Sequence, residues 1–227
     1  RIPSNENQNK ISNYSMGFNS TTFSKIEFGN INNFERTDAF SGSCWFYHRG
    51  NSSQNAYIIS KFNHPTSNTG YEFYINSGGA LNFVIGPGGT GGLMQAVAAA
   101  PPLFQWNHLV WTYDGSSQRG NNNNTGINIY VNGIQQTLGY AGKVSIGGTI
   151  ITNAPFQISG RNGTTANGIN GEIDQVTIFD YVLSLDQVNI LGGKDYVFNF
   201  IPNDYINAGT TLGDSLGTYT GDASISL

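Results

Sequence analysis

Cysteine and charged residues are both scarce in this chain. A single cysteine, Cys44, stands among 227 residues, which excludes an intrachain disulfide, and we expect its thiol to lie buried on a strand. Charged residues make up 11% of the chain, against roughly 25% in an average domain. The 10 basic and 14 acidic residues give a net charge of −4 and form no run of either sign. This balance disfavours a surface that follows phosphates, so nucleic acid is not an expected partner.

Long apolar runs are also missing. The most apolar short run, residues 96–103, is interrupted by Pro101 and Pro102. No segment approaches the roughly 20 apolar residues that span a bilayer, so we expect no membrane insertion.

Glycine and aromatic residues are what the chain has in quantity. Glycine occurs 30 times, and aromatic residues make up 13% of the sequence, which argues against disorder. Short β-prone runs alternate with Gly, Asn and Ser turns. These runs cover residues 24–28, 39–48, 57–62, 71–75, 80–85, 106–113, 127–131, 134–138, 156–159 and 172–179. The pattern predicts an all-β protein whose strands form a two-sheet antiparallel sandwich.

The chain divides into three predicted segments. Residues 1–13 are polar and aperiodic, and we expect them to form an N-terminal arm or linker. Residues 14–191 hold the strands of one large β domain. Residues 192–227 form a C-terminal extension, in which a β-like run at 196–201 precedes a Gly/Thr/Ser tail. This extension is predicted to be an added strand or an assembly segment.

Two short motifs predict local structure directly. Asn132-Gly133 lies between two β-prone runs, and this dipeptide is typical of a type I′ hairpin turn. Ser184 and Gln187 have the spacing of a capping box, which predicts one short helix near 184–191.

Several segments in a fixed order carry a family resemblance. They are FGNINNFERTDAFSGSCWFY, IISKFN, GYEFYINSGGALNFVIG, WNHLVWTYDGSS, INIYVNG, FQISGRNG and NGINGEIDQVTIFDYVLSLDQVNIL. With them, residues 14–191 resemble the laminin-G-like or pentraxin-like jelly rolls of the concanavalin A-like lectin/glucanase superfamily. The resemblance implies a jelly-roll sandwich. It implies less about function, because this fold hosts lectins, adhesion modules, spacers and hydrolases.

The resemblance also allows a test for glycoside hydrolysis. The superfamily's endoglucanases carry a Glu-x-Asp-x-x-Glu or Glu-x-Asp-x-Glu strand, which holds two carboxyl groups about 5–5.5 Å apart for retaining hydrolysis. Glu172 and Asp174 match its start, and strand alternation places them on one side with Val176 and Ile178. Val176 and Thr177 stand where the acid/base would be, and neither can transfer the proton. We therefore expect no enzyme activity.

Calcium is a second property that the resemblance implies. Pentraxin-like members bind Ca²⁺ through an acid-rich loop, and in this chain the matching loop begins with Arg161. A cation in place of oxygen ligands disfavours a double-calcium site, because Ca²⁺ takes 6–8 oxygen ligands. Asp114 and Asp174 are the remaining candidate ligands, so we expect at most one weakly bound calcium ion. Asp114 has the alternative role of stabilising its own turn.

Loops supply the candidate sugar-binding residues. Tyr140 lies between Gly139 and Gly142, where an exposed ring could stack on a pyranose. Asn121, Asn122 and Asn162 offer polar groups in neighbouring loops. The strand aromatics are expected in the core instead: Trp45, Phe46, Trp106 and Trp111.

Two functions remain open from the sequence. The first is a non-catalytic recognition or attachment module that binds a glycan or a cell-surface partner, at an extracellular or virion surface and within a larger assembly. The second is a purely structural virion domain, such as a phage head-decoration, collar or tail-fibre domain. Low charge, the Asn/Gly/Ser-rich composition and the two terminal segments favour the second, and its neighbouring subunits would pair by β-augmentation.

Overall fold

The computed structural model describes residues 15–20, 24–50, 54–89, 92–118, 126–164 and 168–193. Within these ranges the chain forms thirteen strands and one short helix. Residues 1–13 and nearly all of 192–227 lie outside them. The predicted arm and extension therefore stay predictions.

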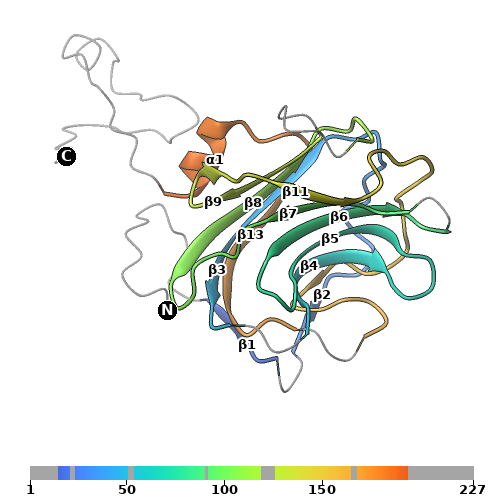
Figure 1. Cartoon of the computed structure of the whole chain (residues 1–227). Helices are drawn as coiled ribbons and strands as arrows, with labels where there is room; N and C mark the ends of the chain where they lie inside the picture. The colour runs from blue at the N-terminus through green and yellow to red at the C-terminus, as the bar shows by residue number, and fades with distance from the viewer. Residues whose placement is uncertain are drawn as a thin grey trace, which may run out of the picture. The chain divides into compact units, whose positions relative to one another are not determined.

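One of the two sheets has six antiparallel strands in the order β1-β13-β3-β8-β9-β10. Figure 1 labels the long strands β3, β8 and β13 side by side. The bounds are β1 (Met16–Phe18), β3 (Phe40–His48), β8 (Trp106–Tyr113), β9 (Ile127–Val131), β10 (Ile134–Gln135) and β13 (Gly171–Phe179).

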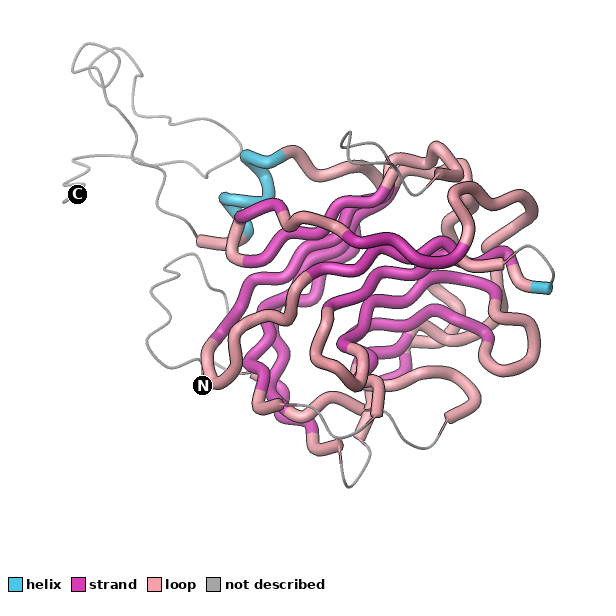
Figure 2. Tube along the Cα trace, in the orientation of Figure 1, coloured by secondary structure: helices cyan, strands magenta, loops and turns pink. Residues whose placement is uncertain are grey.

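The second sheet has seven antiparallel strands in the order β11-β7-β6-β5-β4-β12-β2. Figure 2 shows how loops connect the strands of both sheets. The bounds are β2 (Ile26–Glu27), β4 (Ala56–Asn63), β5 (Thr69–Ile75), β6 (Leu81–Pro87), β7 (Met94–Ala98), β11 (Gly139–Gly142) and β12 (Gln157–Ile158). The predicted two-sheet antiparallel jelly-roll sandwich is confirmed.

The main core lies between the two sheets and is rich in aromatic rings. Trp111 on β8 is fully buried, and its ring centroid lies 4.8 Å from that of Phe73 and 5.8 Å from that of Phe83. A Cβ atom at Gly42 would lie 2.0 Å from the Trp111 ring, so the ring occupies the space that a side chain would need. Cys44 is also fully buried, as predicted, and burial raises the pKa of its thiol.

Half of the aromatic prediction was wrong. Phe46 and Trp111 are in the core, but Trp45 and Trp106 are half-buried. Trp45 precedes Phe46 on the same strand, and successive side chains of a strand point to opposite faces. Trp106 pairs with Tyr47 across β3 and β8, on the same outer face as Trp45. Both tryptophans therefore lie outside the sandwich core.

A β-bulge in β13 overturns the predicted alternation of that strand. The register with β3 shifts between Asp174 and Thr177, and Gln175 has a φ of 49°. The extra residue inverts the alternation beyond it. Val176 and Ile178 therefore pack against the main core, while Thr177 returns to the face of Glu172 and Asp174.

Both local motifs are confirmed. Asn132 and Gly133 have φ values of 52° and 73°, and a type I′ turn requires positive φ at both positions. The strand after the turn is shorter than predicted and spans Ile134–Gln135. The Ser184 hydroxyl accepts from the Gln187 N–H, and the Gln187 side chain accepts from the Ser184 N–H, which completes the capping box.

Helix α1 (Leu185–Leu191) covers part of the outer face of the six-stranded sheet. Its Val188 is fully buried and packs with Val110, Tyr130 and Leu183. No helix in the described ranges is long and apolar enough to cross a membrane.

Candidate functional site

The outer face of the seven-stranded sheet carries a row of mostly polar side chains. Residues opposite each other on antiparallel strands share a face. The register aligns one residue from each strand: Glu27, Gln157, Ser60, Glu72, Val84, Gln95 and Ala141. The sequence neighbours of Glu72, Tyr71 and Phe73, belong to the main core. The row therefore points away from the core.

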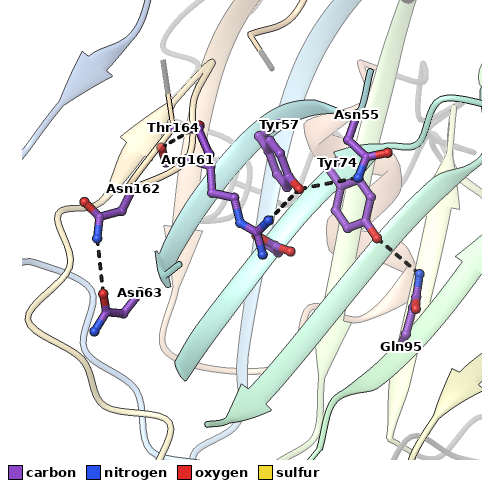
Figure 3. Close-up of polar contacts among 9 residues, drawn as sticks. Asn55, Tyr57, Asn63, Tyr74, Gln95, Arg161, Asn162 and Thr164 are labelled. Carbon is purple, nitrogen blue, oxygen red and sulfur yellow. Dashed lines mark hydrogen bonds and ion pairs between the residues drawn. The ribbon is translucent and has the colours of Figure 1, made fainter. Parts of the chain in front are cut away.

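Glu72 on β5 forms a buried ion pair with Arg161, which comes from the loop after β12. The Arg161 Nε atom lies 3.0 Å from Glu72 Oε2, and the two side chains are 13% and 4% exposed. The Arg161 guanidinium lies 4.9 Å from the centroid of the Tyr57 ring and 5.0 Å from that of Phe62. Its Nη1 donates to the Tyr57 hydroxyl at 3.0 Å (Figure 3). The guanidinium is thus fixed by an ion pair, a hydrogen bond and two aromatic faces.

The turn after Arg161 is held close to the β4–β5 loop. Gly163 has a φ of 75°, and a Cβ atom there would lie 2.0 Å from the His64 carbonyl oxygen. The Thr164 hydroxyl donates to the Arg161 carbonyl oxygen at 3.1 Å. A side chain at position 163 would therefore push the turn, and Arg161 with it, away from the sheet.

Burial changes the acid–base properties of this site. It raises the pKa of Glu72 to about 7, and the Arg161 charge offsets part of that rise. The pKa of the Tyr57 hydroxyl and that of Tyr74 are also raised, chiefly by burial and further by the Glu72 charge. Burial thus favours the protonated form of Glu72 even beside Arg161. Protonation of Glu72 would leave the Arg161 charge without its partner.

Amide side chains surround the two tyrosines. The Tyr57 and Tyr74 ring centroids lie 5.0 Å apart. Asn55 Nδ2 donates to the Tyr57 hydroxyl at 3.4 Å, and Gln95 Nε2 donates to the Tyr74 hydroxyl at 3.2 Å (Figure 3). Gln95 also donates to Asn82 Oδ1 at 2.7 Å. Asn55 and Gln95 are half-buried, so they lie between the buried tyrosines and solvent.

Of the predicted ligand residues that the structure describes, Asn162 lies at this site. Its Nδ2 atom donates to Asn63 Oδ1 at 3.3 Å, and both side chains are half-buried beside Arg161 (Figure 3). Tyr140 on β11 pairs with Ala96 and packs partly against the main core, so its ring is on the opposite face. Asn121 and Asn122 lie outside the described residues.

The two predicted calcium ligands occupy separate places. Asp114 binds its own turn, because its Oδ1 accepts from the Ser116 N–H at 2.8 Å and its Oδ2 from the Gly126 N–H at 2.7 Å. Asp174 Oδ1 accepts from the Gln175 N–H at 2.8 Å. No cluster of three or more His, Cys, Asp or Glu side chains suited to a metal occurs in the part of the chain that the structure describes.

The sheet register also separates these aspartates. Asp114 directly follows Tyr113, which pairs with Phe40 at the start of β3. Asp174 pairs with Trp45, five residues further along the same strand. At about 3.3 Å per residue, this separation exceeds about 15 Å. One calcium ion cannot contact both side chains, so the residues present do not fit a shared site.

The bulge in β13 also bears on the hydrolase test. It places Thr177 on the face of Glu172 and Asp174, at the acid/base position of the Glu-x-Asp-x-x-Glu pattern. Glu172 is ion-paired with Arg49, and Ser15 Oγ donates to it at 3.0 Å. Along the described strand β13 (Gly171–Phe179), no third acid therefore follows Glu172 and Asp174 on this face.

Sequence reasoning missed most of this site. Tyr57, Glu72 and Tyr74 fall within predicted β-prone runs, and Glu72 alternates with core residues there. Gln95 lies on β7 (Met94–Ala98), a strand that the β-prone runs did not include. That alternation is the signal that identifies an outer face. Arg161 was noted only as a replacement for an oxygen ligand. Its partner Glu72 is distant in the chain, so only the fold pairs them.

Several solved structures share the fold of this chain. The binding domain of Paraclostridial Mosquitocidal Protein 1 has a TM-score of 0.56 and 17% identity, over 78% of this chain and 42% of that chain. The Botulinum neurotoxin serotype D ligand binding domain in complex with N-acetylneuraminic acid has a TM-score of 0.55 and 17% identity, over 78% and 41%. This chain therefore spans about two fifths of each toxin domain.

A smaller neighbour is matched almost throughout. The Ruminococcus gnavus IT-sialidase CBM40 bound to α2,3 sialyllactose has a TM-score of 0.53 and 14% identity, over 74% of this chain and 96% of that chain. At these identities the likeness is one of fold. No curated protein sequence matches the chain. A family model matches residues 20–189, and the chain therefore belongs to the concanavalin A-like lectin/glucanases superfamily.

Proposed function

We propose that this protein is a non-catalytic glycan-recognition module. Its ligand docks on the outer face of the seven-stranded sheet, at Asn55, Gln95, Asn162 and Arg161. One observation carries the proposal: half-buried amide side chains surround two tyrosines and a buried ion pair.

The chemistry of these groups suits sugar hydroxyls. A hydroxyl both donates and accepts, and an amide side chain offers both functions. Arg161 uses Nε for Glu72 and Nη1 for Tyr57, which leaves its Nη2 amino group as a further donor. The hydrogen bonds that hold these side chains also reduce the entropy lost when a ligand binds.

A sialylated glycan is the ligand class to test first. Two fold neighbours are complexes with N-acetylneuraminic acid and α2,3 sialyllactose. Arginine pairs readily with a carboxylate through two N–H groups. In this chain Glu72 competes for Arg161, so an acidic sugar should bind better below pH 7, where Glu72 becomes protonated.

The absence of an acid/base on β13 supports a non-catalytic role. Thr177 stands at that position, and Glu172 is engaged by Arg49 and Ser15. An incubation of the protein with β-glucan tests this part separately. Release of reducing ends that disappears in Glu172→Gln would contradict it.

An extracellular or virion-surface setting is part of this proposal. The purely structural virion alternative, with neighbouring subunits as its partners, rests on composition and on the two terminal segments, which lie outside the described residues. A single calcium ion at Asp114 or at Asp174 also stays a prediction.

A broad glycan array, probed in calcium and in chelator, tests the recognition site. We expect saturable binding that falls in Arg161→Lys, which keeps the charge but loses the planar fork, and in Gln95→Ala. Gln136→Ala is the matched control, because Gln136 is a half-buried amide outside this site. A blank array in both conditions, or binding that neither site variant weakens, would overturn the proposal.

A further inference from the structure

A second cluster of aromatic side chains lies on the outer face of the six-stranded sheet. Tyr47 on β3 pairs with Trp106 on β8, and their ring centroids lie 5.8 Å apart. At the next residue pair on the same face, Trp45 pairs with His108, and their ring centroids lie 5.3 Å apart. Trp45, Tyr47 and Trp106 are half-buried. Three aromatic rings on this face thus remain partly open to solvent.

Phe104 is a strongly exposed aromatic residue whose backbone lies beside the end of β3. Its side chain is 66% exposed, the most among the exposed large apolar residues of the described ranges, and that of neighbouring Leu103 is 47% exposed. Phe104 has a φ of 56°, a conformation that a bulky residue rarely adopts. Its N–H donates to the His48 carbonyl oxygen at 2.7 Å, which places it next to Tyr47 and Arg49.

The loop that carries Phe104 is held by hydrogen bonds from a buried side chain, Asn107. Asn107 is fully buried, and its Nδ2 donates to the Pro102 carbonyl oxygen at 2.8 Å and to the Gln105 carbonyl oxygen at 3.1 Å. Its Oδ1 accepts from Asn132 Nδ2 at 3.2 Å. The buried amide therefore holds both ends of the 102–105 segment. An exposed aromatic ring on a braced loop is preorganised for contact.

Polar groups lie beside the rings. The Arg49 guanidinium lies 5.3 Å from the centroid of the Tyr47 ring and is ion-paired with Glu172. Glu172 pairs with Tyr47 across the sheet, so it borders the same cluster. The indole N–H of Trp106 is itself buried and has no hydrogen-bond partner in the part of the chain that is described. Aromatic rings, a carboxylate and a guanidinium thus lie close together on this face.

We propose that Phe104, Tyr47, Trp106, Arg49 and Glu172 form a second carbohydrate site, which binds a neutral pyranose through its apolar face. The face of an aromatic ring is negative and attracts the weakly positive C–H groups of a sugar ring. Arg49 and Glu172 would take the hydroxyl groups at its edge. The inference rests on the proposed glycan recognition but uses none of the residues around Arg161.

The charges of this cluster favour a neutral sugar over a lipid surface. Anionic membranes attract clusters of several Lys and Arg residues. In this cluster the Arg49 guanidinium is paired with Glu172. Asp174 lies two residues further along β13, opposite Trp45. The net charge of the chain is −4. A neutral ligand meets no repulsion at such a site.

The distribution of tryptophan provides a direct measurement. The chain has three tryptophans, of which Trp45 and Trp106 belong to this face, while Trp111 is fully buried in the core. We would titrate the full chain with cellotetraose, chitotetraose and lacto-N-tetraose, and follow tryptophan fluorescence and its quenching by acrylamide. We expect at least one sugar to change the emission and to protect against acrylamide, because Trp106 belongs to the site and Trp45 lies beside it on the same face.

Substitutions then assign the signal to the cluster. Phe104→Ala and Tyr47→Ala should each weaken the binding of that sugar about tenfold, as is usual for an aromatic side chain central to a contact. Val144→Ala is the control, because Val144 is 58% exposed and lies after β11, outside the cluster. Thermal unfolding of each variant checks that the fold is kept. Because Phe104 lies in a loop, its variant keeps the test decisive if Tyr47→Ala unfolds.

The outcomes separate this site from the one around Arg161. Binding that is lost in Phe104→Ala and kept in Arg161→Lys supports the second site. Binding that is lost in Arg161→Lys and kept in Phe104→Ala overturns it and leaves the proposed function intact. A flat titration with all three neutral sugars overturns it as well, whatever the array shows with sialylated glycans. So does self-association of the wild type that Phe104→Ala abolishes, because the cluster would then be an interface between copies.

Discussion

The two outer faces of the sandwich bury charge in different ways. On the seven-stranded sheet, Glu72 and Arg161 form an ion pair that is almost fully buried. On the six-stranded sheet, the pair of Arg49 and Glu172 is much more open, with side chains 43% and 20% exposed. On that face, helix α1 packs through Val188, and the Trp45 ring lies against His108. The same two residue types therefore provide a structural centre on one face and a surface contact on the other.

Burial also shifts the titration of the two faces in opposite directions. It raises the pKa of Glu72 to about 7 on the seven-stranded sheet, and it lowers the pKa of His108 to about 4 on the six-stranded sheet. In each case the neutral form is favoured, because removal from water disfavours charge. Protonation of Glu72 therefore stabilises the folded protein, whereas protonation of His108 destabilises it.

The largest contrast should come from breaking each ion pair. Arg161→Ala leaves Glu72 buried without its partner, and we expect the free energy of unfolding to fall by about 3–5 kcal/mol at pH 8. At pH 5 the loss should be smaller, because protonated Glu72 needs no counter-charge. Arg49→Ala is the matched control on the open face, with an expected loss of about 0–1 kcal/mol. Urea unfolding at both pH values measures these differences, and equal losses would contradict the contrast.

Glu72→Gln tests the proton linkage of the buried pair. The pKa of Glu72 in the folded protein, about 7, lies above the ordinary value of 4.5. Its contribution to stability is therefore complete below pH 4.5 and is lost as the pH rises to 7. We expect the stability of Glu72→Gln, relative to wild type, to improve by about 3 kcal/mol over this range. The difference between the two proteins isolates Glu72, because the other carboxylates titrate in both. A difference that does not vary with pH would mean that Glu72 is ionised throughout.

His108→Gln should show the opposite pH dependence. The pKa of His108 in the folded protein, about 4, lies below the ordinary value of 6.5. Its contribution is therefore complete above pH 6.5 and is lost as the pH falls to 4, by about 3 kcal/mol at most. The variant lacks the titrating group, so its stability relative to wild type should rise as the pH falls. Chemical denaturation at pH 7, 5.5 and 4 measures this, and a parallel decline of both proteins would contradict it.

The smallest expected effect concerns the helix that covers the six-stranded sheet. Ser184→Ala removes the hydroxyl that caps α1, and we expect a loss of about 1 kcal/mol. The emission of Trp45 and Trp106 should change little, because α1 packs through Val188 against Val110 and Tyr130. Ser116→Ala, in an exposed turn, serves as control. An equal loss in both variants would show that the cap contributes nothing specific.

The sequence predicts those parts of the structure that depend on neighbouring residues. The Asn132-Gly133 turn and the Ser184 cap each follow from a few adjacent side chains, and both are present. The bulge at Gln175 could not be predicted in this way, because it is defined by the register of β13 against β3. Because the prediction lacked this one extra residue, it assigned the side chains after Gln175 to the wrong faces of the sheet.

The candidate site follows the same rule. Asn162 is a candidate from the sequence because a polar residue in a loop is visible there, and its role stays a prediction. The pairing of Arg161 with Glu72 depends on two segments far apart in the chain. Trp45 and Trp106 were assigned to the core by residue type alone. The alternation of Trp45 with Phe46 in a single strand already contains the correct answer, since both cannot point inward.

The outermost strands of both sheets have a further consequence for association. All four are short: β1 has three residues, β10 and β2 have two each, and β11 has four. A sheet edge offers its unpaired N–H and C=O groups as a template for another chain, and a short edge offers few of them. The described outermost strands themselves therefore offer a neighbouring molecule little backbone to extend. Contacts through these four strands would depend on the side chains that they and their loops present.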